Sequence, residues 1–167
     1  STIGDSNWNY SQIDMRANIE ALPFKNTCFD AAMSIVVLEH TPDPKRALCE
    51  IARVLKSRGS FLLVVPQQWE VHQAPNDYFR FTQFGLQYLL QNAGFTTSQI
   101  QPLGGFFTLA SRRCLNAITF FMQGYRWLVF PLVAAVAIMF ALILPLFDGL
   151  DQKKQFTLGY ICQVEKL

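Results

Sequence analysis

The chain has 167 residues, of which 51% are hydrophobic and 16% are charged, and its formal net charge is +2. This apolar content excludes an intrinsically disordered protein, and the length fits one domain of typical size. A net charge this small and this evenly spread argues against nucleic acid as a partner.

The first forty residues predict loops followed by a buried strand. Residues 1–10 are polar and rich in turn formers, so a loop is expected there, and Gln12 to Asn18 predict a short strand. The run from Phe29 to Leu38 is almost continuously apolar. Such a run is typical of a parallel strand covered on both faces.

A helix is predicted after this strand. Asp43 is a suitable N-cap and Pro44 a suitable first helical residue. Apolar residues then recur at helical spacing until Gly59, where we expect the helix to end. They are Leu48, Ile51, Ala52 and Leu55.

A second buried strand follows from Ser60 to Val65 and stops at Pro66. Strand, helix and strand within about 35 residues form a crossover unit, which requires parallel strands. Thr82 begins a second helix that Gly94 closes, with Phe81 placed to pack on Leu86.

Two further segments predict strands, from Phe95 to Gln101 and from Phe156 to Val164. The fold class expected is therefore α/β, a partial doubly wound, Rossmann-like, mostly parallel sheet with a hydrophobic helical insertion before the last strand. We expect residues 1–107 to form the partial α/β core, residues 108–153 the helical insertion and residues 154–167 the closing strand of that core.

The insertion contains the most unusual segment of the chain. Trp127 to Phe147 is 21 residues long and has no charge, which is long enough to cross a bilayer as a helix. A single crossing would separate the last strand from its sheet, and the stretch before it is short for a second span. We therefore expect a re-entrant or in-plane helix at a membrane surface, with a buried flap as the alternative.

The order of these signals resembles the class I S-adenosylmethionine-dependent methyltransferases, of the type with a Leu-Pro-Phe turn followed by Phe-Asp. The resemblance covers about half of the chain. It rests on ANIEALPFKNTCFD (17–30), VVLEHTPDPKRAL (36–48), EIARVLKSRGSFLLVVP (50–66) and HQAPNDYFRFTQFGLQYLLQNAGF (72–95).

The resemblance implies S-adenosylmethionine as the cofactor, bound at the carboxyl edge of the sheet. Asn18 occupies the position of the family's adenine-binding Asp, and its carbonyl oxygen can accept the same hydrogen bond. Ile19 would cover the ring. The methionine portion would lie against the strand end and loop at Ser34, Leu38, Glu39 and His40, although residues 38–40 also fit a helix-entry loop with locally satisfied polar groups.

The family's glycine-rich loop has no counterpart in the sequence. Gly104-Gly105 follows the matching region and fits a turn better. We therefore expect an N-terminally truncated methyltransferase that is inactive alone.

His72 is the candidate catalytic base, because it follows the second strand and its usual pKa suits proton abstraction. A surface histidine is the alternative. Asp77 and Arg80 are expected to form a local ion pair that orders the same loop.

The four cysteines predict no metal site, because they are far apart in sequence and form no Cys-x-x-C pair. Reduced cytoplasmic thiols are expected at Cys28, Cys49, Cys114 and Cys162.

The function expected is methyl transfer to a small or lipid-linked acceptor at the cytoplasmic face of a membrane. A degenerate methyltransferase-like binding domain and a membrane-anchored scaffold without catalysis are the alternatives.

Overall fold

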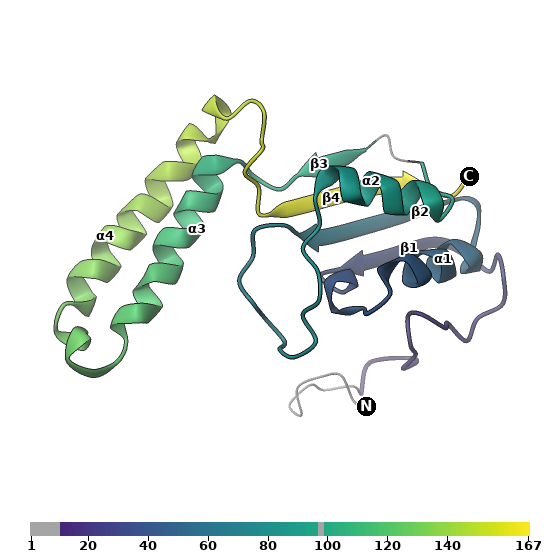
Figure 1. Ribbon diagram of the computed structural model, residues 1–167, viewed down its shortest axis with the longest axis horizontal. Helices are drawn as coiled ribbons and strands as arrows, with labels where there is room; N and C mark the ends of the chain where they lie inside the picture. The colour runs from purple at the N-terminus through teal and green to yellow at the C-terminus, as the bar shows by residue number, and fades with distance from the viewer. Residues whose placement is uncertain (1–10, 97–98) are drawn as a thin grey trace. The chain divides into compact units, whose positions relative to one another are not determined.

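The computed structural model describes residues 11–96 and 99–167 (Figure 1). The loop predicted at residues 1–10 lies outside the described residues. The chain divides into two compact units. We call Ser1–Gln101 with Tyr160–Leu167 the sheet unit, and Pro102–Gly159 the helical unit.

The sheet has four strands in the order β1-β2-β4-β3. Their bounds are β1 Phe29–Ile35, β2 Leu55–Pro66, β3 Ile100–Pro102 and β4 Gly159–Glu165. β1 and β2 are parallel, and β4 runs the opposite way (Figure 1). The predicted α/β fold with a mostly parallel sheet is confirmed.

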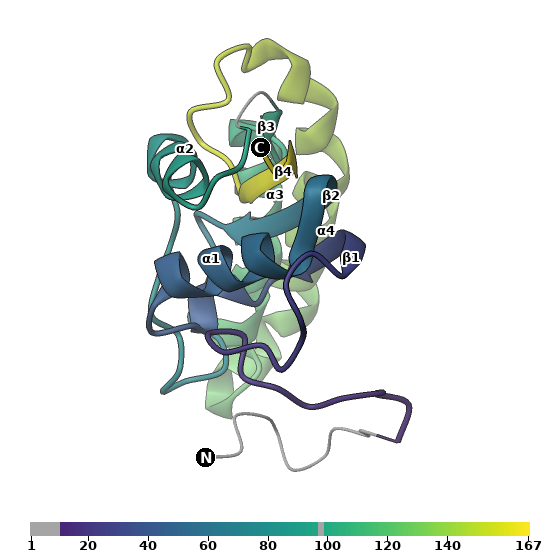
Figure 2. The same ribbon diagram turned by 90° about the vertical axis from the view of Figure 1, so that its right-hand side faces the viewer.

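Two helices, α1 (Pro44–Val54) and α2 (Gln83–Asn92), pack on the same face of this sheet (Figure 2). Both begin at the predicted caps. The Asp43 carboxylate accepts the N–H of Arg46, and the Thr82 hydroxyl accepts the N–H of Gly85. The apolar residues of α1 therefore face Phe61 and the rest of the core.

The end of α1 differs from the prediction. The helix ends at Val54, and the residues up to Gly59 belong to β2 because Leu55 already pairs with Phe29. The register of the β1–β2 pairing then shifts at an irregularity between Phe29 and Ala31. Gly59 is required at this point, because a Cβ there would lie 2.8 Å from the carbonyl oxygen of Lys56.

Two predictions about the N-terminal part of the sheet unit are wrong. Residues 12–18 form no strand, and the segment makes only an isolated bridge between Asn18 and Ala21. β1 is not covered on both faces, because Met33 and Ile35 are 68% and 48% exposed. Helices α1 and α2 both pack on the face opposite these two side chains.

The predicted strand at 95–101 is shorter than expected, and residues 97–98 of it lie outside the described residues. β3 begins at Ile100, while Phe95 makes an isolated antiparallel bridge with Lys166. The N–H of Gln163 donates to the carbonyl of Gln99 at 3.0 Å. β4 is therefore antiparallel to β3, and it lies between β2 and β3 in the sheet.

The helical unit contains a hairpin of α3 (Phe106–Ile118) and α4 (Phe130–Ile143), an arrangement that the sequence disfavoured. The Ser111 hydroxyl donates to the carbonyl of Ala141 at 2.9 Å. The Asp148 carboxylate accepts the N–H groups of Gly105 and Thr108, which stabilises the first turn of α3. Short 3-10 segments complete the unit: η2 Thr119–Phe121, η3 Gly124–Leu128 and η4 Leu144–Leu150.

An ion pair on α1 fixes the Leu-Pro-Phe turn. Arg53 donates to both carboxylate oxygens of Glu50, at 2.8 and 2.9 Å. The same guanidinium donates to the carbonyls of Leu22 and Phe24, and Glu50 accepts the N–H of Leu22. Two side chains therefore satisfy three backbone groups of a turn that has no ladder partner of its own.

Glu50→Gln is expected to lower the free energy of unfolding at neutral pH. Hydrogen bonds from Arg53 lower the pKa of Glu50 from 4.5 to about 2. A carboxylate with a depressed folded-state pKa stabilises the protein above its unfolded-state pKa, and this contribution is lost as the pH falls toward the folded-state value. The difference in urea midpoint between wild type and variant should therefore shrink between about pH 4.5 and about pH 2.

Asp30→Asn is the matched control. Asp30 and Lys56 form an ion pair in which both side chains are well exposed, so its loss should change stability by less than about 1 kcal/mol. Equal urea midpoints of Glu50→Gln and wild type near neutral pH would contradict the role of the Glu50–Arg53 pair.

Candidate functional site

The carboxyl ends of β1 and β2 lie at the same edge of the sheet, because the two strands are parallel. The 3-10 turn η1 (Leu38–His40) follows β1, and the loop at residues 67–81 follows β2. Ligands of open α/β sheets bind outside this edge. The edge is therefore the first place to search for chemistry.

Three titratable side chains converge there. The Nε2 atoms of His40 and His72 are 3.0 Å apart. Oε1 of Glu39 lies 3.8 Å from Nε2 of His40 and 3.5 Å from Nε2 of His72. We call Glu39, His40 and His72 the edge cluster.

The two imidazole rings of the edge cluster are oriented by backbone carbonyls. Nδ1 of His40 lies 2.7 Å from the carbonyl oxygen of Asn76, and Nδ1 of His72 lies 3.1 Å from that of Glu70. A carbonyl oxygen can only accept, so each Nδ1 carries a proton and donates. In a neutral ring, Nε2 then presents its lone pair to the edge cluster.

Glu39 is an unusual carboxylate because its side chain has no exposed surface. Neither of its oxygens has a hydrogen-bond partner within the described part of the chain. Burial raises the pKa of Glu39 above 4.5, while the two histidines act in the opposite direction. Perturbed carboxyl groups of this kind are typical of functional sites.

The predicted Asp77–Arg80 ion pair is confirmed, and it holds the loop that carries His72. Arg80 donates to both Asp77 oxygens, at 2.6 and 2.7 Å, and to the carbonyl of Glu70. Asp77 also accepts the N–H of His72. The hydrogen bonds from Arg80 keep the pKa of Asp77 well below its usual range.

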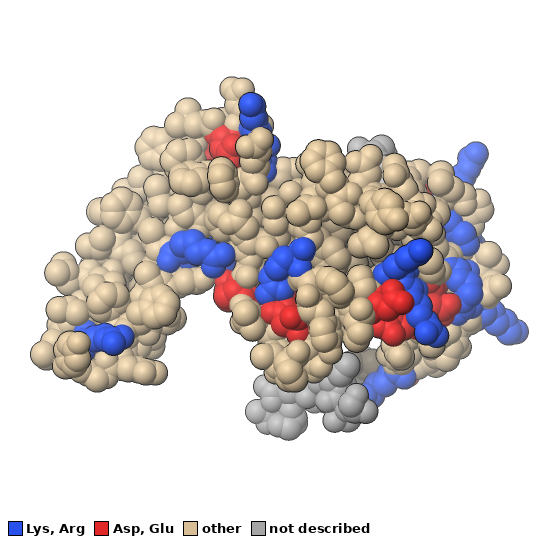
Figure 3. Space-filling view, in the orientation of Figure 1, with Lys and Arg blue, Asp and Glu red and all other residues tan. Residues whose placement is uncertain are grey.

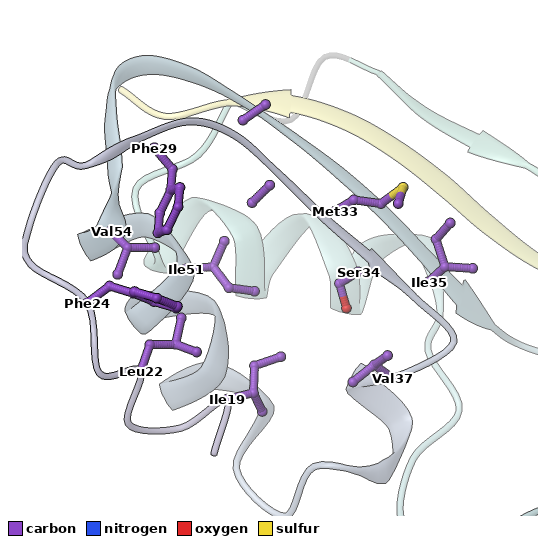
Figure 4. Close-up of a pocket in the computed structure, with 12 residues that line it drawn as sticks. Ile19, Leu22, Phe24, Phe29, Met33, Ser34, Ile35, Val37, Ile51 and Val54 are labelled. Carbon is purple, nitrogen blue, oxygen red and sulfur yellow. The ribbon is translucent and has the colours of Figure 1, made fainter. Parts of the chain in front are cut away.

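A pocket of about 360 Å³ lies along β1 beside the Leu-Pro-Phe turn (Figure 4). Its walls are mostly apolar and include Ile19 and Ser34, both singled out from the sequence. Ser34 is 6% exposed, and its hydroxyl has no hydrogen-bond partner among the residues that the structure describes. A buried hydroxyl of this kind is expected to meet a ligand or water.

The remaining predicted residues lie elsewhere. Asn18 is exposed, and its Oδ1 accepts the N–H of Glu20. Leu38 is fully buried in the core. The structure therefore brings Ile19 and Ser34 to one pocket and Glu39, His40 and His72 to the edge cluster.

The sequence reasoning missed the convergence of Glu39 with His72. They are 33 positions apart and form no recognisable spacing motif. Their shared place, one after each of two predicted parallel strands, was the signal that could have revealed it.

Part of the chain is similar to known proteins. Residues 5–63 match a family profile described as "Methyltransferase domain". Two uncharacterised proteins of Methanocaldococcus jannaschii are similar to parts of the chain. One is 49% identical over 49 residues, which cover 29% of this chain and 21% of the relative. The other is 44% identical over 55 residues, which cover 33% and 22%.

Solved structures share the fold. The [4+2]-cyclase SpnF matches with a TM-score of 0.52 at 20% identity, over 90% of this chain and 54% of that one. An S-adenosylmethionine-dependent methyltransferase of Methanosarcina mazei matches with a TM-score of 0.51 at 15% identity, over 90% and 65%. The chain thus spans about a fifth of the curated relatives, and between half and two thirds of these structures. Residues 5–63 thus match the methyltransferase domain profile, and the chain has the fold of the class I S-adenosylmethionine-dependent methyltransferases.

Proposed function

We propose that this chain takes part in methyl transfer from S-adenosylmethionine to a small or lipid-linked acceptor. The observation that carries the proposal is the buried, unpartnered hydroxyl of Ser34 in the pocket along β1. The residues that the methyltransferase profile matches include this strand and the Leu-Pro-Phe turn beside it.

The pocket residues fit part of such a cofactor. Ile19 offers an apolar surface for an aromatic base, and the Ser34 hydroxyl can donate or accept one hydrogen bond. The volume, about 360 Å³, lies at the lower end of the range of ligand pockets. Asn18 precedes Ile19 and is the proposed partner of the adenine amino group, while buried Leu38 would fix the strand end.

S-adenosylmethionine supplies an activated methyl group on a sulfonium, so the protein's main task is to place the acceptor in line. An acceptor hydroxyl or amine must also lose a proton. His72 is the proposed site of that step, because its Nε2 lies at the sheet edge within 3.5 Å of the Glu39 carboxylate.

We further propose that other segments of a complete methyltransferase domain cover β1. Met33, Ile35 and Val37 are 68%, 48% and 41% exposed, an apolar row that is costly to leave in water. The matched structures are longer than this chain, which supports the proposal. Cofactor binding by the 167 residues alone should accordingly be weak.

The helical unit is proposed to attach to a membrane surface. The segment Phe130–Leu150 is long and apolar enough to cross a membrane by length and composition, with a mean hydropathy of 2.6, and only 6% of it is buried. Charged side chains are sparse over α3 and α4 in Figure 3. Exposed apolar surface of this extent favours contact with lipid.

Both ends of the hairpin are proposed to stay on the same side of the membrane. Asp151, after α4, accepts the N–H of Phe106 at the start of α3 at 2.8 Å. A chain that enters and leaves the hairpin at one place suits a re-entrant or in-plane arrangement. This position would bring a lipid-linked acceptor to a cytoplasmic enzyme.

A binding domain without methyl transfer is the second candidate. The Asn18 oxygen is already engaged by Glu20, and the related fold of a [4+2]-cyclase means that fold alone does not define the reaction.

Ser34→Ala should show whether the Ser34 hydroxyl binds a ligand or only stabilises the fold. Removing an unpartnered buried hydroxyl should leave the melting temperature unchanged or raise it, since the wild-type group is desolvated without compensation. The increase in melting temperature caused by a high concentration of S-adenosylmethionine should become smaller, because one hydrogen bond to the ligand is lost.

Ser60→Ala, at an exposed position of β2, is the control and should change neither quantity. An equal ligand-induced shift in Ser34→Ala and wild type would remove Ser34 from the site. Micromolar binding by the unmodified chain, measured by calorimetry, would contradict the proposal that further segments complete the crevice.

The full chain should float with phosphatidylcholine vesicles in a density gradient. Leu132 and Leu142 are 69% and 71% exposed, and burying each in lipid contributes about 1.5–3 kcal/mol. The double variant Leu132→Ser, Leu142→Ser should therefore float much less.

The control is the double variant Phe84→Ser, Tyr88→Ser, which removes two exposed aromatic residues from α2 in the sheet unit. It should float like the wild type. Trypsin outside the vesicles should cut after both Lys25 and Lys153. Protection of Lys153 alone would indicate a true crossing, and loss of flotation by the wild type would exclude attachment.

A further inference from the structure

We propose that Glu39, His40 and His72 form a binding site for one divalent transition-metal ion, with Zn²⁺ as the best fit. The proposal goes beyond the proposed methyl transfer and does not depend on it. It rests on the types of atoms that meet in the edge cluster, on their spacing and on their burial.

The edge cluster brings acceptors together without a donor. Both Nδ1 atoms donate to backbone carbonyls, of Asn76 and Glu70, so neutral rings direct both Nε2 lone pairs inward. These two atoms nevertheless lie 3.0 Å apart. The third atom, a Glu39 carboxylate oxygen, is also an acceptor. Lone pairs at this separation repel one another unless a proton or a metal ion lies between them.

The spacing is close to that of the ligands of a metal ion. The three atoms form a triangle with sides of 3.0, 3.5 and 3.8 Å. Ligands of tetrahedral Zn²⁺, with bonds of about 2.0–2.2 Å, lie about 3.3–3.6 Å apart. One point in the plane of the three atoms lies about 2 Å from each of them, and changes of about 0.3 Å in the 3.0 and 3.8 Å sides would give tetrahedral spacing.

Burial strengthens the argument. Glu39 is 0% exposed and His40 is 8% exposed, and both Glu39 oxygens are without a hydrogen-bond partner in the described residues. An isolated buried carboxylate is costly, whereas one that coordinates a metal ion is satisfied. This unpartnered group aimed into the cluster is a second observation, independent of the triangle, and it too points to a cation.

The donor set predicts selectivity. Two imidazoles and one carboxylate suit Zn²⁺ and neighbouring transition metals, whereas Mg²⁺ and Ca²⁺ prefer oxygen ligands. Three protein ligands leave a fourth position for water or an acceptor oxygen, the arrangement of catalytic zinc sites. The two carbonyls behind the rings provide the outer hydrogen bonds that metal-binding histidines require.

The test uses the full chain after treatment with a chelator. Calorimetric titration with Zn²⁺ should show one equivalent bound, and Co²⁺ should give the visible absorption bands of a four-coordinate site. Mg²⁺ should not compete. Glu39→Gln and His72→Ala should each weaken Zn²⁺ binding by at least about ten-fold.

Folding is monitored separately. Glu39→Gln removes a buried charge, so its metal-free melting temperature should equal or exceed that of the wild type, while the increase caused by Zn²⁺ should disappear. Cys28→Ser and Cys49→Ser, at exposed thiols, should bind Zn²⁺ like the wild type.

The proposal is overturned if the wild type binds no Zn²⁺, if Glu39→Gln binds with wild-type affinity, or if a cysteine variant loses binding. If the wild type binds no Zn²⁺, a proton shared between His40 and His72 would account for their short contact. None of these outcomes bears on S-adenosylmethionine, whose binding is measured in the absence of metal.

Discussion

The parallel pairing of β1 with β2 is the constraint on which the rest of the site depends. Parallel strands end at the same edge of a sheet, and the residues that follow them must therefore meet. Glu39 and His40 follow β1, and His72 lies in the loop after β2. The crossover through α1 fixes this direction, because its apolar residues can be buried only on the face that Phe61 and Leu63 present.

Ion pairs convert this topology into a defined surface. Neither the Leu-Pro-Phe turn nor the loop at 67–81 belongs to a ladder, so their backbone groups need other partners. Arg53, paired with Glu50, satisfies the turn, and Arg80, paired with Asp77, satisfies the loop. Each guanidinium is held by a bidentate carboxylate, and so its remaining donors are directed at backbone carbonyls. The turn beside the pocket and the loop that carries His72 are therefore held by ion pairs in addition to apolar packing.

Much of the sheet unit could be predicted from the sequence, because local signals there agree with tertiary packing. Asp43 and Thr82 cap α1 and α2 at the predicted positions, through a carboxylate and a hydroxyl oxygen respectively. The end of α1 could not be predicted, since Leu55 fits a helix by periodicity and is recruited to β2 only by pairing with Phe29. The solvent exposure of Met33 could not be predicted either, because an apolar run does not reveal which neighbours cover it. The contact of Glu39 with His72 leaves no spacing motif, and only their places after two parallel strands indicate it.

The loop after β2 and the edge cluster are coupled through one residue. The backbone carbonyl of Glu39 accepts the N–H groups of Tyr78 and Phe79, at 2.9 and 3.2 Å, while its carboxylate faces His72 near the other end of the same loop. Movement of the loop would thus change both interactions of Glu39. A cation held by the edge cluster would therefore also stabilise the observed conformation of this loop.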